Sequence, residues 1–207
     1  MKFTSDYCLI FDLDGTLVDS EALCKQAFVD LLPTITESID DLVNRYRGRK
    51  FLDILNDLEK RYTLELTSDF EFRYRERVSE LIEAFLEPIE GVVDMLQALS
   101  MARCIASSGP RSKIEQSLRV SKLDKFFAKN TFSSYEVDSW KPDPGLLLHA
   151  SARMGFGPNK CLVVDDSEVG IEAAKAAGMM ALHFRPQCAE IKAGEFSHMS
   201  QLVGQLP

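Results

Sequence analysis

The sequence predicts an α/β fold: a doubly wound parallel sheet with a block of helices inserted after its first strand. From residue 88 onwards, short apolar runs alternate with helical patterns, which is typical of parallel strands connected by helices. Between residues 18 and 87, apolar side chains recur at three- and four-residue spacing, and this predicts helices alone. A chain of 207 residues is long enough for a full α/β core and a small additional unit.

The first strand is expected at residues 7–11, a short apolar run. In the block that follows, Ser20 is expected to cap a helix that Pro33 ends. The aromatic stripe that follows Ser68 predicts a face that packs against other helices, which is far more common than a ligand site. The expected helices of this block span residues 21–32, 38–46, 51–62 and 68–86.

The remaining strands are expected at residues 103–107, 130–133, 161–164 and 180–184. Asp143 and Pro144 form an N-cap and first-position pair for a helix that ends near Gly155, and Ser167 is a second expected N-cap. The other expected helices span residues 90–99, 111–118 and 168–177, whereas residues 191–207 carry no clear pattern. The simplest architecture is a Rossmann-like core of residues 1–17 and 88–207 with an inserted α-helical cap of residues 18–87.

Composition narrows the class of protein. A net charge of −8 argues against a broad nucleic-acid surface. The chain reaches its first strand at once, which leaves no room for a signal peptide, and no apolar stretch is long enough to cross a bilayer. We therefore expect a cytoplasmic protein with neither nucleic-acid nor membrane partners, while the oligomeric state stays open.

Cysteine and histidine suggest no separate chemistry. The five cysteines are odd in number and widely spaced, so they predict neither a disulfide framework nor a zinc site. Cys8, Cys104 and Cys161 fall in or beside expected strands and should behave as small buried apolar residues. The three scattered histidines are expected to be structural or surface residues.

The most informative segment is residues 9–17, where an apolar strand stops at two carboxylates one residue apart. Because alternate residues of a strand share a face, Asp12 and Asp14 can point towards one place at its carboxyl end, and Gly15 permits a sharp turn there. In an open α/β sheet that end is where ligands bind. Two converging carboxylates suit a Mg²⁺ site, although such a pair alone is equally typical of a solvated turn.

Three later segments favour the metal site over the solvated turn. Residues 104–106 form a short apolar run followed by the hydroxyls of Ser107 and Ser108. Lys141 stands before an expected helix start, and residues 161–164 run into Asp165 and Asp166. With Asp12 and Asp14, this ordered set resembles the four motifs of the haloacid dehalogenase-like hydrolase superfamily, spread across nearly the whole chain. Each motif alone would be weak, but their joint occurrence is a strong signal.

The resemblance implies an α/β core with a helical cap inserted after the first motif, and Mg²⁺ as cofactor. Asp12 is the candidate nucleophile, which would form an aspartyl phosphate, and Asp14 the candidate general acid and base. Asp12, the backbone carbonyl of Asp14, and the carboxylates of Asp165 and Asp166 would hold the metal, with Asp166 the more direct of the last two. A charged cap on the following helix is the alternative interpretation of the Asp165–Asp166 pair, and the two can coexist.

The other motifs would hold the phosphoryl group. Ser107 is expected to bond the transferring oxygens, with a simple turn hydroxyl as its alternative. Ser108 and Gly109 lie where a helix begins, so their N–H groups can help to hold an anion. Lys141 supplies the cation that offsets the negative charge of Asp12 and phosphate. Thr16 is expected to order the turn after Asp12.

A basic cluster surrounds Gly48 in the expected cap. By its charge alone this cluster is most simply a solvated face. Capped relatives, however, place a glycine-containing loop over the active site, so Arg47, Arg49 and Lys50 become candidate contacts to an anionic or hydroxylated leaving group. Arg45 belongs to the same cluster, and the sequence does not show which members face inward.

These observations support three hypotheses. Asp14 is absent from family members that cleave carbon–halogen bonds, so its presence favours the phosphatase and phosphomutase branch. The first hypothesis is a Mg²⁺-dependent phosphatase of a small phosphorylated metabolite, a sugar or sugar-acid phosphate, similar to bacterial phosphatases of 6-phosphogluconate. The alternatives are a β-phosphoglucomutase, which would use the same two aspartates, and a non-catalytic binding protein of the same fold.

Overall fold

The computed structural model describes residues 6–127, 129–186, 188 and 190–206, so the first five residues of the predicted core lie outside the described part. The described chain forms one parallel sheet in the order β3-β2-β1-β4-β5-β6, which confirms the predicted fold class. Its strands are β1 (Cys8–Phe11), β2 (Ala102–Ser107), β3 (Thr131–Ser133), β4 (Cys161–Asp165), β5 (Met180–Phe184) and β6 (Glu195–Phe196). The short β6 lies in the segment where the sequence carried no clear pattern.

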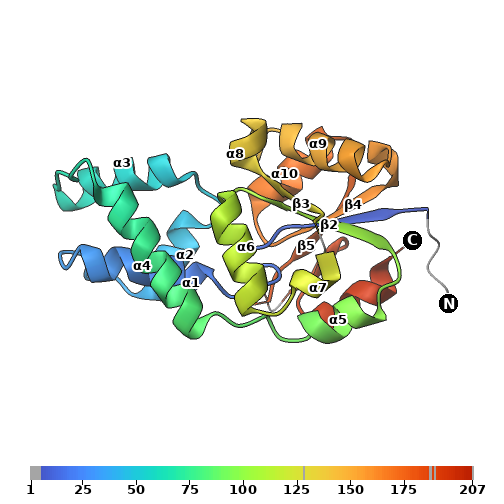
Figure 1. Cartoon of the computed structure of the whole chain (residues 1–207), viewed down its shortest axis with the longest axis horizontal. Coiled ribbons are helices and arrows are strands. Elements are labelled where there is room, and N and C mark those ends of the chain that lie inside the picture. The colour runs from blue at the N-terminus through green and yellow to red at the C-terminus, as the bar shows by residue number, and fades with distance from the viewer. Residues whose placement is uncertain (1–5, 128, 187, 189, 207) are drawn as a thin grey trace.

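Helices cover both faces of this sheet (Figure 1). Because side chains alternate along β1, Leu9 and Phe11 join one apolar cluster and Cys8 and Ile10 the other. The first cluster includes residues of α5 (Val92–Ala98), α6 (Arg111–Val120), α7 (Asp124–Phe127) and η2 (Met199–Gln205). The second includes residues of α9 (Gly145–Met154) and α10 (Glu168–Ala176), while α8 (Ser134–Val137) and η1 (Pro158–Lys160) are short connections.

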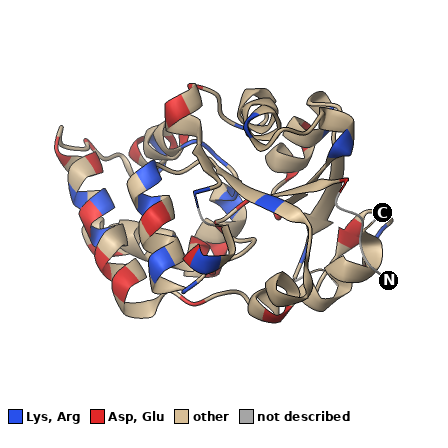
Figure 2. Ribbon diagram, turned by 45° about the vertical axis from the view of Figure 1, so that its right-hand side comes forward, with Lys and Arg blue, Asp and Glu red and all other residues tan. Residues whose placement is uncertain are grey.

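A separate group of helices, here called the helical unit, lies to one side of the sheet (Figure 1). It consists of α1 (Glu21–Leu31), α2 (Ile39–Tyr46), α3 (Phe51–Tyr62) and α4 (Phe70–Phe85). These helices enclose an apolar cluster of their own, with Phe28 at its centre, and charged side chains of both signs alternate along them (Figure 2). The chain enters and leaves the unit side by side, because Val18 pairs with Pro88 in an antiparallel bridge.

The strand order indicates the edge of the sheet at which a ligand is expected to bind. After β1 the chain builds outwards through β2 and β3, then returns to add β4 on the other side of β1. The carboxyl ends of β1 and β4 therefore flank the point where the winding direction reverses, which is where ligands bind in open α/β sheets. Asp12 follows β1, and Asp165 ends β4 beside it.

Predictions at three helix starts had different outcomes. Ser20 is the N-cap residue of α1, as predicted, but its hydroxyl donates to the carboxylate of Asp14 and makes no capping hydrogen bond. Pro144 is the N-cap of α9 and not its first helical residue; Asp143 accepts a hydrogen bond from the Gly145 N–H at 2.8 Å, so the helix starts one residue later. The capping predicted for Ser167 is confirmed, since its hydroxyl accepts from the Gly170 N–H at 3.2 Å.

The remaining composition-based expectations concern burial and membrane spans. Cys8, Cys104 and Cys161 are fully buried, as predicted. Within the described residues, no helix combines the length and apolar character that crossing a membrane requires.

Phe28 provides a test of how the helical unit is stabilised. Phe28 is 1% exposed, and its ring stacks 4.3 Å from the Tyr74 ring, with the rings of Phe51 and Phe70 at 6.2 Å and 6.4 Å. We expect Phe28→Ala to reduce the free energy of unfolding by about 3–5 kcal/mol, because it removes a buried aromatic side chain and leaves a cavity. Phe72→Ala is the control, since Phe72 is 64% exposed, and equal losses from both in urea titrations would contradict this account.

Candidate active site

The centre of the site is a buried ammonium between two carboxylates. Asp12 extends the pairing of β1 with β4, since its N–H donates to the Val164 carbonyl at 2.9 Å. The Lys141 Nζ lies 2.6 Å from Asp12 Oδ1 and 2.7 Å from Asp165 Oδ2. The structure thus brings together residues from three of the four motifs.

Asp165 and Asp166 face different partners although they are adjacent in sequence. Asp165 Oδ1 accepts from the Ser167 N–H at 2.9 Å and from its hydroxyl at 2.7 Å. Asp166 accepts from the Thr16 hydroxyl at 3.1 Å and from the Arg47 guanidinium at 2.7 Å. Thr16 therefore connects the turn after Asp12 to the end of β4.

Asp12, Asp165 and Asp166 form a buried triad that could hold a cation. Each offers a carboxylate oxygen, and these oxygens all lie within 4.8 Å of one another. A set of hard oxygen donors fits Mg²⁺, which also keeps several waters. The participation of the Asp14 carbonyl stays a prediction.

The charges of this triad are crowded. Burial raises the pKa of Asp12 well above its usual range, against the opposing effect of Lys141. Burial, together with the charge of Asp165, raises the pKa of Asp166 to about 7, although Arg47 and the Thr16 hydrogen bond lower it. A bound cation would favour the ionised form of both groups.

The carboxylate of Asp14 is directed elsewhere. Its Oδ1 atom lies 2.6 Å from the Lys113 Nζ and also accepts from the Ser20 hydroxyl. Although burial raises the pKa of Asp14, the charge and hydrogen bond of Lys113, with the Ser20 hydrogen bond, lower it overall. The Asp14 carboxylate thus has a set of partners separate from those of the acidic triad.

Lys113 was missed by the sequence reasoning. It lies in the first turn of α6, the end of a helix where a positive charge is unfavourable. A lysine in that position, shortly after the Ser107–Gly109 segment, was the available signal that its charge serves something other than the helix.

The serine motif occupies the start of this same helix. Ser107 ends β2, is 1% exposed and accepts from the Gly109 N–H at 3.1 Å. Ser108 and Gly109 line the cavity described next, whereas Ser107 lies beneath its surface. The segment therefore presents its backbone close to the cavity, as an anion site at a helix start requires.

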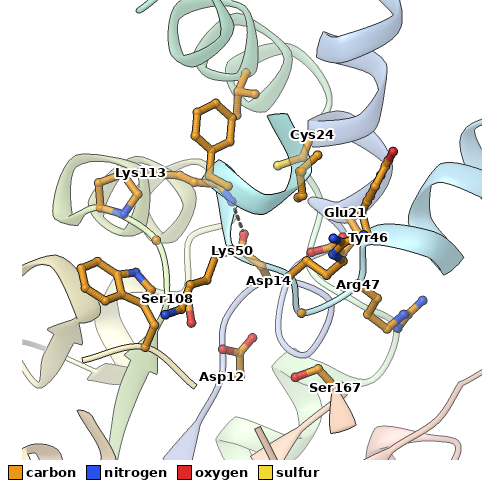
Figure 3. Close-up of a pocket in the computed structure, with 18 of the residues that line it drawn as sticks. Asp12, Asp14, Glu21, Cys24, Tyr46, Arg47, Lys50, Ser108, Lys113 and Ser167 are labelled. Atoms are coloured by element: carbon orange, nitrogen blue, oxygen red, sulfur yellow. Dashed lines mark hydrogen bonds and ion pairs between the residues drawn. The ribbon is translucent and has the colours of Figure 1, made fainter. Parts of the chain in front are cut away.

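A cavity of about 300 Å³ lies between the core and the helical unit (Figure 3). The core side contributes Asp12, Asp14 and Lys141, and the helical unit contributes a mixed wall. Residues of that wall that line the cavity include Phe51, Ile54, Tyr74, Val78 and Ile82, together with the charged side chains of Glu21, Lys25 and Arg75.

The basic loop around Gly48 reaches this cavity with three of its four basic members. Arg47 points to Asp166, as described, while the more exposed Arg49 and Lys50 also line the space. Arg45 is absent from the described lining and forms an ion pair with Glu37. The structure thus separates the inward members of the cluster, which the sequence left open.

Aromatic contacts join the helical unit to the core at the rim of the cavity. Arg75 of α4 donates to the Tyr135 hydroxyl at 3.0 Å. The Trp140 ring meets the Tyr135 ring edge-on at 5.4 Å, and the Lys50 ammonium lies 5.7 Å from the centre of the Trp140 ring. Because Trp140 immediately precedes Lys141, these contacts link the helical unit to the loop that carries the central lysine.

A Rossmann-like core with four converging motifs and a helical unit over its functional edge defines a class of hydrolase. The model of the haloacid dehalogenase-like hydrolase family matches residues 8–178, and the chain belongs to this family. A 6-phosphogluconate phosphatase from Escherichia coli is 35% identical over 206 residues, covering 94% of this chain and 91% of the relative.

Two further comparisons agree with this membership. A phosphorylated carbohydrates phosphatase from Thermotoga maritima is 32% identical over 183 residues, covering 84% of this chain and 83% of that relative. The solved structure of a haloacid dehalogenase-like protein from Agrobacterium tumefaciens superposes with a TM-score of 0.83 at 28% identity and covers 97% of both chains. The present chain is therefore a hydrolase of this family.

A substitution at Gly170 would test how closely the backbone packs against the acidic triad. A Cβ at this position would lie 2.0 Å from the Asp165 carboxylate carbon, so we expect Gly170→Ala to displace Asp165 and destabilise the fold by about 1–3 kcal/mol. Gly204→Ala is the control, because a Cβ there would meet nothing within 4 Å. Both would be measured by denaturant unfolding, and indistinguishable midpoints for the two variants would contradict the close packing.

Proposed function

We propose that this hydrolase is a Mg²⁺-dependent phosphatase of a small sugar or sugar-acid phosphate, with 6-phosphogluconate as its leading candidate substrate. The observation that carries the proposal is that the carboxylates of Asp12 and Asp14 have different partners. Asp12 belongs to the acidic triad and lies beside the fixed cation of Lys141, whereas the Asp14 carboxylate contacts Lys113 and Ser20. This is the separation that a nucleophile and a proton-transferring group require.

The metal fits the residues present. Asp12, Asp165 and Asp166 would hold Mg²⁺, and the backbone carbonyl of Asp14 is proposed to complete the protein's share of the ligands. When bound, the ion would neutralise charge on the phosphoryl oxygens.

In the first half of the reaction, an oxygen of Asp12 attacks phosphorus and forms an acyl phosphate. The bond from phosphorus to the ester oxygen breaks, and Asp14 gives a proton to that oxygen, so the alcohol leaves neutral. In the second half, Asp14 removes a proton from water, which attacks the acyl phosphate and regenerates Asp12 with release of inorganic phosphate.

The remaining core residues hold the transferring group. Lys141 would offset the charge that accumulates between Asp12 and phosphate, and its burial makes that interaction stronger than in water. The hydroxyl of Ser107 and the backbone of Ser108 and Gly109 would bind phosphoryl oxygens. None of these groups needs to move far, because the end of β2 fixes the serine segment and two ion pairs hold Lys141.

We further propose that residues 18–87 act as a cap over a core of residues 1–17 and 88–207. The cavity wall formed by the helical unit would exclude water during transfer, and the paired crossings at Val18 and Pro88 are suited to act as a hinge. Opening at that hinge would release the product.

The charge of the cavity lining favours an anionic substrate. Among the residues that the structure describes, seven basic and four acidic side chains line the cavity, although the chain as a whole has a net charge of −8. The similarity to phosphatases of 6-phosphogluconate and of phosphorylated carbohydrates supports sugar and sugar-acid phosphates as the class. Arg47, Arg49 and Lys50 are the proposed contacts of the helical unit to the substrate.

The test is phosphate release from a panel that includes 6-phosphogluconate, glucose 6-phosphate and β-glucose 1-phosphate. We expect turnover that Mg²⁺ supports and excess EDTA abolishes. Asp12→Asn should lower kcat by roughly 10³-fold or more, because the amide is a poor nucleophile. Conversion of β-glucose 1-phosphate to glucose 6-phosphate without phosphate release would indicate a mutase instead, and comparable activity in Asp12→Asn would remove the nucleophile assignment.

The basic loop offers a second test. We expect Lys50→Ala to raise the KM for 6-phosphogluconate by about tenfold, the effect of one lost charge-assisted hydrogen bond, and to change that for p-nitrophenyl phosphate much less. Arg47→Ala should act in the same direction, although its contact with Asp166 adds an effect on metal binding. Arg45→Ala is the matched control, since Arg45 pairs with Glu37 outside the cavity lining, and equal effects of Lys50→Ala on both substrates would make the loop a plain charged surface.

A further inference from the structure

We propose that Lys113, assisted by Lys25, recognises a carboxylate carried by the leaving group of the substrate and so makes the enzyme selective for sugar-acid phosphates. This inference rests on the proposed phosphatase function and assigns a specificity role to two lysines outside the four motifs. It is carried by the reach of Lys113 to Asp14, the enclosure of both lysines and the different positions of the other enclosed cations.

The reach of Lys113 follows from the position of Asp14. The Lys113 Nζ lies 2.6 Å from Asp14 Oδ1, and a proton donor must come within hydrogen-bond distance of the leaving oxygen. The ammonium is therefore within about 6 Å of the ester oxygen that Asp14 protonates. Figure 3 shows Lys113 reaching Asp14 from the side opposite to Asp12, which is the side on which a leaving group would lie.

Both lysines are enclosed. The Lys113 side chain is 19% exposed and the Lys25 side chain 5%, and both line the cavity. Side chains with large apolar surfaces, those of Tyr74, Val78 and Ile82, line the same cavity. In such surroundings a charge is screened weakly, so two ammonium groups would attract a substrate carboxylate more strongly than surface lysines would.

Acidic groups share this region and set the selectivity. Lys25 pairs with Glu21 at 2.7 Å, and Glu21 also lines the cavity. A neutral hydroxyl on the leaving group would compete poorly with Glu21 and Asp14 for the two ammonium groups, whereas a carboxylate can share them as a third anion.

The other enclosed cations have different positions. Lys141 is held between Asp12 and Asp165, and Arg47 is held by Asp166. Arg49 and Lys50 lie in the more exposed loop. Among the described residues that line the cavity, Lys113 is therefore the enclosed cation that contacts Asp14 directly.

Helix electrostatics gives an independent reason. Lys113 lies in the first turn of α6, where the partial positive charge of the helix start disfavours a cation. Helix stability therefore does not explain its presence there. Its ion pair with Asp14 does, and that pair holds the ammonium at the edge of the cavity, where a substrate anion can also reach it.

The experiment compares two substrates that differ at one carbon: 6-phosphogluconate, which ends in a carboxylate, and glucitol 6-phosphate, which ends in a hydroxymethyl group. We expect the wild-type protein to prefer 6-phosphogluconate in kcat/KM. In Lys113→Met that preference should fall by about tenfold, mainly through KM, with Lys25→Met acting in the same direction but less.

Lys175→Met is the matched control, because Lys175 is exposed on α10 and lies outside the described cavity lining. Circular dichroism and thermal unfolding would verify the fold of each variant, and Lys113→Gln replaces Lys113→Met if the latter does not fold. An equal loss on both substrates would overturn the proposal, since Lys113 would then only position Asp14. An unchanged preference would overturn it as well.

Binding measurements distinguish a failure of this inference from a failure of the proposed function. Calorimetric titration of both compounds into Asp12→Asn, with and without Lys113→Met, measures recognition when no turnover occurs. If wild-type protein releases no phosphate from any substrate but Lys113→Met still weakens binding of 6-phosphogluconate selectively, the phosphatase proposal fails and the recognition stands. Equal binding of both compounds to Asp12→Asn would overturn the recognition.

Discussion

The buried ammonium of Lys141 is the interaction on which the rest of the site depends. Its side chain is 4% exposed and bridges Asp12 and Asp165 from two adjacent strands. Three carboxylates whose oxygens lie within 4.8 Å would repel one another strongly in a buried place. A cation fixed between two of them removes part of that repulsion, so the ends of β1 and β4 can carry their charges side by side.

The second constraint is steric: the backbone approaches the carboxylates so closely that only glycine fits at two positions. Gly15 has a φ of +80°, and a Cβ there would lie 2.5 Å from Asp166 Oδ2. Gly170 occupies a comparable position against Asp165. The acidic centre is thus enclosed by backbone on both sides, which leaves its open face directed to the cavity. Any side chain at either glycine would push a carboxylate away from the place where Lys141 and the neighbouring strand hold it.

The sequence predicted the core half of this site because the information there is local. Asp12, Ser107 and Asp165 each stand at the end of an apolar strand or directly after it, and parallel strands bring such ends to one edge. The helices of the inserted block were also predicted, since their apolar periodicity is carried by each segment alone. Local patterns therefore determined the fold class and the charged centre together.

What was missed depends on side-chain contacts that periodicity does not describe. The hydroxyl of Ser20 was expected to cap α1, but the carboxylate of Asp14, six residues earlier in the chain, accepts its hydrogen bond instead. Lys113 and the Arg75–Tyr135 pair acquire their roles only when α6, α4 and α8 meet around the cavity. Periodicity states which face of a helix is buried, but not which charged partner that face will find.

The two halves of the cavity therefore differ in how firmly they are built. The phosphate side is fixed by strand ends, buried ion pairs and close backbone packing, so its geometry is set before a substrate arrives. The side formed by the helical unit is held to the core largely by polar contacts between side chains. These are the hydrogen bond from Arg75 to Tyr135, the contact of Lys50 with the Trp140 ring, and the ion pairs of Arg47 with Asp166 and of Arg119 with Glu83. Contacts of that kind can be broken and remade in each catalytic cycle at small cost. On the proposed function, this asymmetry is what a phosphatase needs: a rigid site for the group that reacts and a wall that can open for the group that leaves.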